Sequence, residues 1–237
     1  MNDRAKRRER RRRRAGKDYE AEDLGNGIAM ATADAVVRAL GSLPGDLGWD
    51  ELAAHVIPVL PRRRPMPAGA GEPFRVTLPP GIPTGFGVDI GPAFLVVGPS
   101  LLAGWQVGPA DLVARALANL RERLRPVRPR DVLCQSVDGV PVRILQTGVG
   151  CASALVLLPD ELRRILGPDA QCLIAPMRDV LVSMPPDVDR SFAGWLNEEL
   201  ASMDPNGLAL DALVLERDDL RYERLPGVDA AATFARR

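Results

Sequence analysis

The sequence predicts an α+β fold, in which a mostly antiparallel sheet of hairpins has helices packed on a face. The strongest observation is the Asp138-Gly139 pair between two alternating patterns, residues 132–137 and 140–146, which is typical of a two-residue hairpin. A second observation is that strand pairs alternate with helical segments after residue 109. We expect a helical N-terminal segment to precede this sheet.

The N-terminal part is expected to be helical before a proline-rich linker. Residues 29–40 are rich in alanine, and residues 49–57 place apolar side chains on one helix face, so both predict helices that come before Pro58. Residues 58–73 contain five prolines and predict an extended linker. The predicted divisions are a basic disordered arm (1–17), a helical segment (18–57), the linker (58–73) and an α+β domain (74–228).

The α+β domain is expected to begin with strands at residues 74–78 and 93–97. Residues 90–110 carry no charge, but their three prolines and four glycines favour a buried strand, a turn and a helix start over a membrane span. A helix from Pro109 to Pro126 should present one apolar stripe. The later predictions are an apolar run that could form a strand (154–158), a helix (159–166), strands (172–175 and 180–184), a helix (192–203) and a hairpin (210–216 with 220–224).

Charge is balanced in total but unevenly placed. The chain has 237 residues with 31 basic and 31 acidic groups, yet residues 1–17 alone carry ten Lys and Arg against two acidic residues. Such an arm predicts salt-sensitive binding to nucleic-acid phosphates. Anionic lipid, a solubilising tail and a start site placed too far upstream are the alternatives. The arginines proposed for nucleic-acid contact are Arg7, Arg8, Arg10, Arg11, Arg12, Arg13 and Arg14.

Two short segments are candidates for a pocket. The small-residue loop 147–153 contains Gly148, Gly150 and Cys151, and such a loop can direct backbone N–H groups at a phosphate. Arg178 and Asp179 occupy a turn between two predicted strands. The loop lacks the lysine of a nucleotide-binding loop, so a tight packed turn is the favoured interpretation.

The sequence does not complete a metal site or a nucleophilic site. The single histidine, His55, lies far upstream of Cys151 and Ser153, so neither has a histidine base downstream. Four carboxylates that could gather around a metal each have a simpler role in a turn or at a helix start: Asp138, Asp160, Asp179 and Asp187. We therefore expect no metal and no cofactor.

Three cysteines and the absence of an apolar segment after the first arginines predict a cytoplasmic protein.

Two parts of the chain carry short motifs. The first is Trp105–Gly108, followed by Asp111-Leu112 and residues 116–120, and the second is the later run Ile174–Leu181. They resemble two motifs of the YtpQ-like family of bacterial proteins. The resemblance covers about residues 90–224. It implies a bacterial intracellular setting and adds no activity, since the family has none assigned.

The sequence thus favours a non-catalytic domain that binds or regulates an unidentified protein partner. The first alternative is a nucleic-acid-associated protein anchored by the arm. The second alternative is an enzyme whose site lies near Cys151 or near Arg178 and Asp179.

Overall fold

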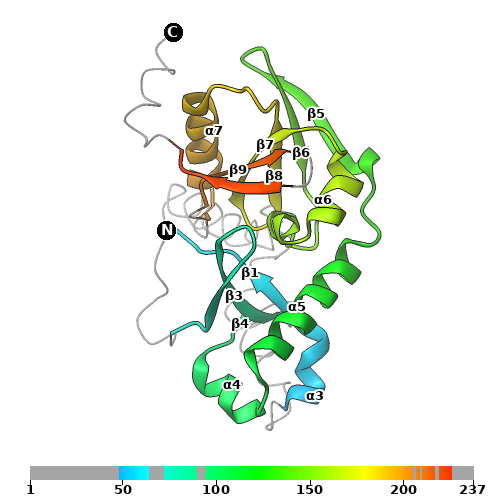
Figure 1. The fold of residues 1–237 in the computed structure, drawn as a ribbon, viewed down its shortest axis with the longest axis vertical. Helices are drawn as coiled ribbons and strands as arrows, with labels where there is room; N and C mark the ends of the chain where they lie inside the picture. The colour runs from blue at the N-terminus through cyan, green and yellow to red at the C-terminus, as the bar shows by residue number, and fades with distance from the viewer. Residues whose placement is uncertain are drawn as a thin grey trace, which may run out of the picture.

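The computed structural model describes residues 48–63, 72–89, 94–204, 207–208, 210–216 and 219–225. These residues form two antiparallel sheets with helices packed against them, so the predicted α+β class is confirmed (Figure 1). The basic arm, the predicted helix at residues 29–40 and the C-terminal tail lie outside the described residues. Among the described residues, no helix is long and apolar enough to cross a membrane.

A small lobe is built on a four-stranded sheet with β3 at its centre. β1 pairs with one side of β3, while β2 and β4 pair with successive parts of its other side. Two short helices, α3 (Trp49–Leu52) and α4 (Pro99–Trp105), complete this lobe. The strands are β1 (Val56–Val59), β2 (Arg75–Leu78), β3 (Ile82–Asp89) and β4 (Phe94–Val96).

The helix predicted over residues 49–57 is wrong in its second half. α3 ends at Leu52, a 3₁₀ turn η1 follows at Ala53–His55, and Val56 then begins β1. Val56 and Ile57 are fully buried in this strand, and Pro58 lies within it opposite Phe86. Pairing with β3 therefore outweighs the helical spacing, and Pro58 is tolerated because β1 is an edge strand.

Helix α5 (Pro109–Leu124) joins the two lobes (Figure 1). Its predicted apolar stripe is confirmed, and the stripe divides in two along the helix. Leu112 and Ala116 pack in the core of the small lobe, whereas Leu120 and Leu124 pack in the core of the larger one. The Nδ2 of Asn119 donates hydrogen bonds to two carbonyls of the small lobe, at 2.7 and 2.8 Å. One helix therefore fixes both lobes to each other.

The larger lobe contains a six-stranded sheet in the order β10-β9-β7-β8-β6-β5. Asp138 and Gly139 have φ of 49° and 81° and connect β5 to β6, so the predicted hairpin is confirmed. A short 3₁₀ turn, η2 (Pro129–Asp131), leads from α5 into β5. The strands are β5 (Val132–Val137), β6 (Val140–Leu145), β7 (Gln171–Met177), β8 (Val180–Met184), β9 (Ala212–Glu216) and β10 (Asp219–Glu223).

Helices cover both faces of this sheet. Alternate residues along β7 and β8 point to opposite sides: Leu173 and Leu181 pack with α6 (Pro159–Leu166), and Ile174 and Val182 pack with α7 (Arg190–Ser202). Each helix connects two strands with one other strand between them, since β8 lies between β6 and β7, and β7 between β8 and β9. The hairpins and crossovers together leave β5 and β10 as the two edges.

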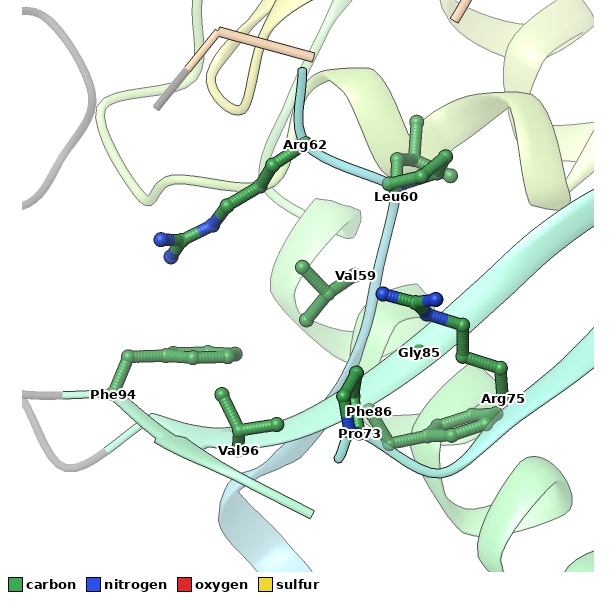
Figure 2. A pocket seen from close by; sticks show the side chains of 10 residues that line it. Val59, Leu60, Arg62, Pro73, Arg75, Gly85, Phe86, Phe94 and Val96 are labelled. Carbon is green, nitrogen blue, oxygen red and sulfur yellow. The ribbon is translucent and has the colours of Figure 1, made fainter. Parts of the chain in front are cut away.

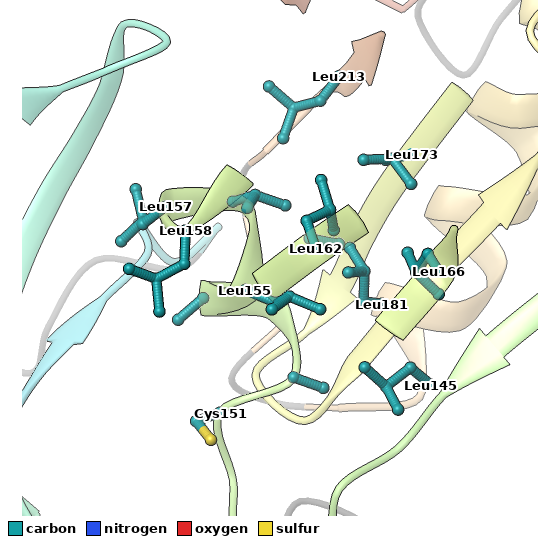
Figure 3. Close-up of a cluster of buried hydrophobic side chains, with 14 of the residues drawn as sticks. Leu145, Cys151, Leu155, Leu157, Leu158, Leu162, Leu166, Leu173, Leu181 and Leu213 are labelled. Atoms are coloured by element: carbon teal, nitrogen blue, oxygen red, sulfur yellow. The ribbon is translucent and has the colours of Figure 1, made fainter. Parts of the chain in front are cut away.

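The apolar run at residues 154–158 does not form the predicted strand. Residues Ser153–Leu157 form the 3₁₀ turn η3, and every side chain in it is buried. Leu155, Leu157 and Leu158 lie in the cluster that also contains Leu162 of α6 (Figure 3). This run is apolar because core side chains pack around it on all sides. Hydrophobicity alone therefore could not distinguish this buried 3₁₀ turn from a buried strand.

Candidate functional site

The loop 147–153 and the Arg178-Asp179 turn, both singled out by the sequence, meet in the structure. The Asp179 side chain is fully buried and accepts hydrogen bonds from the loop. The Thr147 hydroxyl and the Gly148 N–H donate to its two oxygens, the latter at 2.6 Å. The N–H groups of Cys151 and Ala152 add contacts at 3.1 and 3.2 Å. The turn between β7 and β8 is therefore clamped to the loop that follows β6.

The loop has the shape of an anion-binding turn, but the anion belongs to the same chain. Gly148 and Gly150 have φ of 70° and 72°, a region open to glycine that lets successive N–H groups converge. These donors are directed at the Asp179 carboxylate. Ser153 donates from its N–H and its hydroxyl to the Arg178 carbonyl, at 3.2 and 2.7 Å. The arrangement supports a structural role for the loop.

Cys151 is placed where its thiol is a poor nucleophile. Its side chain is buried, and burial, followed by the negative charge of Asp179, raises the pKa of the thiol to about 11. The thiol is therefore protonated at neutral pH, whereas the thiolate is the reactive form. His55 is exposed in η1 of the small lobe and provides no base beside this thiol.

Arg178 extends in a different direction, toward the small lobe. Its guanidinium carbon lies 4.2 Å from the centre of the Phe94 ring, and its Nη2 lies 3.9 Å from Oδ2 of Asp89. Asp89 also pairs with Arg123 of α5 at 2.5 Å. Burial lowers the pKa of Arg178 from its usual value, an effect that the Asp89 charge opposes. Arg178 is thus a contact between the lobes.

The four carboxylates that the sequence analysis considered do not form a metal site within the part of the chain that the structure describes. No three His, Cys, Asp or Glu side chains lie close enough together there to hold a metal ion. Asp138 sits in the hairpin turn, and Asp160 lies in the first turn of α6. The arginines proposed for nucleic-acid binding, Arg7 to Arg14, lie outside the described residues, so that interpretation stays a prediction.

Sequence reasoning missed the edge position of β5 in the larger sheet. Among the described residues, β5 pairs only with β6 and ends the strand order. Its side chains from Leu133 to Ser136 are all exposed, and Leu133 retains 54% of its accessible area. The uncharged run Leu133-Cys134-Gln135-Ser136 was a possible signal, because exposed strands in the middle of a sheet are rare and exposed edges usually carry charge.

The hairpin register defines which backbone groups face outward from this edge. Val137 and Val140 flank the two-residue turn and form a hydrogen-bonded pair. Hydrogen-bonded and non-hydrogen-bonded positions alternate along an antiparallel pair. Leu133 and Gln135 therefore direct their N–H and C=O groups at β6, and Cys134 and Ser136 direct theirs away from the sheet.

Comparisons with known proteins identify no relative of this chain. No protein-family model, no curated protein and no solved structure matches the chain. The resemblance to the YtpQ-like family stays a prediction.

Proposed function

We propose that this chain is a non-catalytic protein-binding domain, which recruits an extended segment of a partner protein to the β5 edge. The observation that carries the proposal is the run of four exposed, uncharged residues on an edge strand, Leu133 to Ser136. The outward N–H and C=O groups of Cys134 and Ser136 match those of an added strand. Strand addition supplies affinity through these main-chain hydrogen bonds.

The opposite edge of the same sheet lacks this character. β10 carries charged side chains at Asp219, Arg221 and Glu223. Arg221 pairs with Glu216 of β9 at 2.6 Å and with Asp219 at 3.5 Å. Charged side chains on an edge strand discourage pairing with another chain. The contrast supports β5 as the edge that recruits a partner.

Side chains on β5 favour a partner segment with alternating apolar residues. Leu133 lies opposite Ile144, and Val137 lies opposite Val140. Val137, Val140 and Ile144 are only partly buried at the margin of the core under α7. A strand placed beside β5 would cover Leu133 and extend this apolar margin, because residues at alternate positions share one face.

The state of the candidate catalytic groups supports the non-catalytic part of the proposal. Asp179 is used by the loop, and Cys151 is a buried thiol with a raised pKa. All three cysteines are free, which suits the cytoplasm that we propose as the site of binding.

A site-specific photo-cross-linking experiment tests the proposal. Leu133 is replaced by a photo-reactive phenylalanine analogue in the full chain, which is then expressed and irradiated in its native host. Tyr222 on β10, which is 43% exposed, receives the same replacement as the matched control. We expect one dominant adduct with another protein from position 133 and none from position 222.

A second substitution separates strand addition from mere proximity. Ser136→Pro removes an outward N–H and leaves the β5–β6 ladder intact, and proline is tolerated on edge strands. We expect it to remove the adduct formed at position 133. The proposal is wrong if the adduct persists in the proline variant, if both edges cross-link equally, or if neither does. An adduct with a second copy of this chain would replace the proposal with self-association.

A further inference from the structure

An open groove lies between α3 and α4, at the end of the small lobe that is farthest from the six-stranded sheet (Figure 1). Its volume is about 690 Å³, and its lining combines apolar and acidic side chains. Trp49, Leu101 and Trp105 supply the apolar part, and Asp50 and Glu51 supply the acidic part. The groove is separate from the β5 edge, which belongs to the larger lobe.

Two tryptophan rings form most of the apolar part of the lining. The ring centres of Trp49 and Trp105 lie 5.4 Å apart with their planes tilted by 50°, so each ring supports the other. Trp105 is buried in the core of the small lobe, whereas Trp49 is only partly buried at the margin of this core. Gly104 adds no side chain, and a Cβ built there would meet no atom within 4 Å. The accessible part of an indole ring is a favourable surface for a stacked guanidinium.

Asp50 and Glu51 give the groove a negative charge that no described residue neutralises. Both residues are exposed in the first turn of α3, and neither carboxylate forms an ion pair or a hydrogen bond with a described residue. No basic residue is among the described lining of the groove. The adjacent carboxylates Asp160 and Glu161 differ, because each lies within ion-pair distance of an arginine in α6. The groove therefore has two negative charges available to a basic partner.

A second hollow in the small lobe has the opposite charge. Its lining includes Arg62, Arg75 and Phe94, and no Asp or Glu is among its described lining residues (Figure 2). Like charges repel, so a basic segment is disfavoured at this hollow and favoured at the groove between α3 and α4. A nucleic acid is disfavoured at the groove for the same reason, because its phosphates and the two carboxylates are all negative.

We infer that the groove between α3 and α4 binds the basic arm of the same chain, residues 1–17. The arm carries ten Lys and Arg against two acidic residues, so its charge is opposite to that of the groove. Arginines of the arm stack on the Trp49 ring and pair with Asp50 and Glu51. A guanidinium suits this lining because it combines stacking on a ring with paired hydrogen bonds to a carboxylate.

The arm is close enough along the chain to reach the groove. Thirty residues separate Lys17 from Gly48, which is part of the lining. A chain of thirty residues can span up to about 100 Å, and a tethered segment has an effective concentration of about 1 mM. Contacts that are weak one by one therefore suffice to hold the arm. Binding in the groove competes with the phosphate binding predicted for the same arginines, because one guanidinium cannot serve both.

Carbodiimide cross-linking of the full chain tests this inference. Lys6 and Lys17 are the only lysines in the sequence, so a cross-link between a lysine and a distant carboxylate shows where the arm lies. At about 0.01 M salt, we expect cross-links within one chain to Asp50 and Glu51, at least about tenfold above those to Asp187, which is exposed in the larger lobe. About 1 M salt should remove this preference, because it reduces the screening length to about 3 Å.

Two variants identify the groove as the binding site. Gly104→Arg places a positive side chain in the groove, where there is open space for it, and leaves both carboxylates in place. It should lower the cross-links to Asp50 and Glu51 at least about fivefold. Ala118→Arg adds the same charge on the exposed face of α5 and should leave these cross-links unchanged.

Four results would overturn the inference. The first is an even spread of cross-links over Asp50, Glu51 and Asp187, and the second is a preference that persists at about 1 M salt. The third is cross-linking that occurs only between two chains, as covalent dimers. The fourth is an equal effect of Gly104→Arg and Ala118→Arg, or no effect of a folded Gly104→Arg variant.

Discussion

The loop 147–153, which donates hydrogen bonds to Asp179, and the β5 edge belong to the same lobe. They differ in whether their polar groups already have partners. Asp179 is buried and accepts hydrogen bonds from Thr147, Gly148, Cys151 and Ala152. Along β5, the backbone groups of Cys134 and Ser136 face away from β6, the one strand among the described residues with which β5 pairs. The polar groups of the first region are paired with one another, whereas the outward backbone groups of the second have no partner strand in the part of the chain that the structure describes.

This difference teaches where a binding function belongs. When only the sequence is known, a glycine-rich loop, a cysteine and an Arg-Asp pair suggest a catalytic or ligand-binding site. In the fold, three of the loop's N–H groups and the carboxylate satisfy one another, so a ligand would have to displace Asp179. The β5 edge requires no such displacement, because no described strand pairs with the outward backbone groups of Cys134 and Ser136.

The largest expected effect is the loss of stability on removing the Asp179 carboxylate. Asp179→Ala leaves the Cys151 and Ala152 N–H groups buried without an acceptor, in addition to the lost contacts at Thr147 and Gly148. Each buried donor without a partner costs about 1–3 kcal/mol, so we expect a loss of about 3 kcal/mol or more. Urea unfolding of the full chain measures this change.

Asp187→Ala is the matched control for that measurement. Asp187 is exposed in the connection between β8 and α7, and an exposed substitution of this kind changes stability by about 0.5 kcal/mol or less. Equal effects of the two substitutions would show that the Asp179 contacts add nothing specific to the fold.

Cysteine reactivity gives the second contrast between the regions. Cys134 is exposed on β5, while Cys151 and Cys172 are buried, and burial raises the pKa of each buried thiol to about 11. With a disulfide reagent at pH 8, we expect the Cys134 thiol to react at least about a hundredfold faster than the thiols of Cys151 and Cys172. Cys134→Ser should remove the fast phase, and a fast phase that remains would contradict the placement of Cys151.

The same pKa values predict how stability depends on alkaline pH. The pKa of Cys151 rises from 9.0 to about 11 on folding, so the folded state holds the proton more tightly than the unfolded state. The resulting stabilisation is fully present below pH 9 and is lost as the pH rises toward about 11. Replacing Cys151 with alanine should flatten this part of the stability profile, and an unchanged slope would contradict the prediction.

A smaller effect is expected from glycine in the loop. Gly148 has a φ of 70° and open space where a Cβ would stand, so Gly148→Ala should cost about 1–2 kcal/mol through backbone strain alone. Gly104, within helix α4, also has open space and no positive φ. Gly104→Ala should stabilise the chain by about 0.5–1 kcal/mol, so the two substitutions should differ in sign in a thermal unfolding experiment.

The smallest expected effect on stability comes from the β5 edge. Ser136→Pro should change the free energy of unfolding by about 0.5 kcal/mol or less, because its N–H does not belong to the β5–β6 ladder. Gln135→Pro removes an N–H that does belong to this ladder and should destabilise the chain by about 3 kcal/mol. Similar losses from both proline substitutions, measured by urea unfolding, would place the hydrogen-bond alternation on β5 in doubt.

Local signals account for the parts of the fold that the sequence could predict. The turn at Asp138 and Gly139 depends on two adjacent residues with positive φ, and the stripe on α5 depends on spacing within one helix. Residues 56–57 satisfied a helical spacing as well, but their strand depends on pairing with Val88 and Gly87, about thirty residues later. A nonlocal partner decided the outcome there.

The candidate site was predictable only as a set of residue types. The donors to Asp179 are 27 to 32 residues away along the chain, so the sequence offers no distance between them. The sequence likewise does not reveal which strand lies at the edge, because strand order in a sheet is a property of the assembled topology. Strand β5 could be predicted from its pattern, whereas its position as the last strand could not.

Amide hydrogen exchange of the purified full chain tests the central claim most directly, since it reports whether the β5 edge is open. We predict an alternation along one strand, with protected amides at Leu133, Gln135 and Val137 and fast exchange at Cys134 and Ser136. Strong protection at both Cys134 and Ser136 in the isolated chain would contradict the account, because the edge would then already be paired.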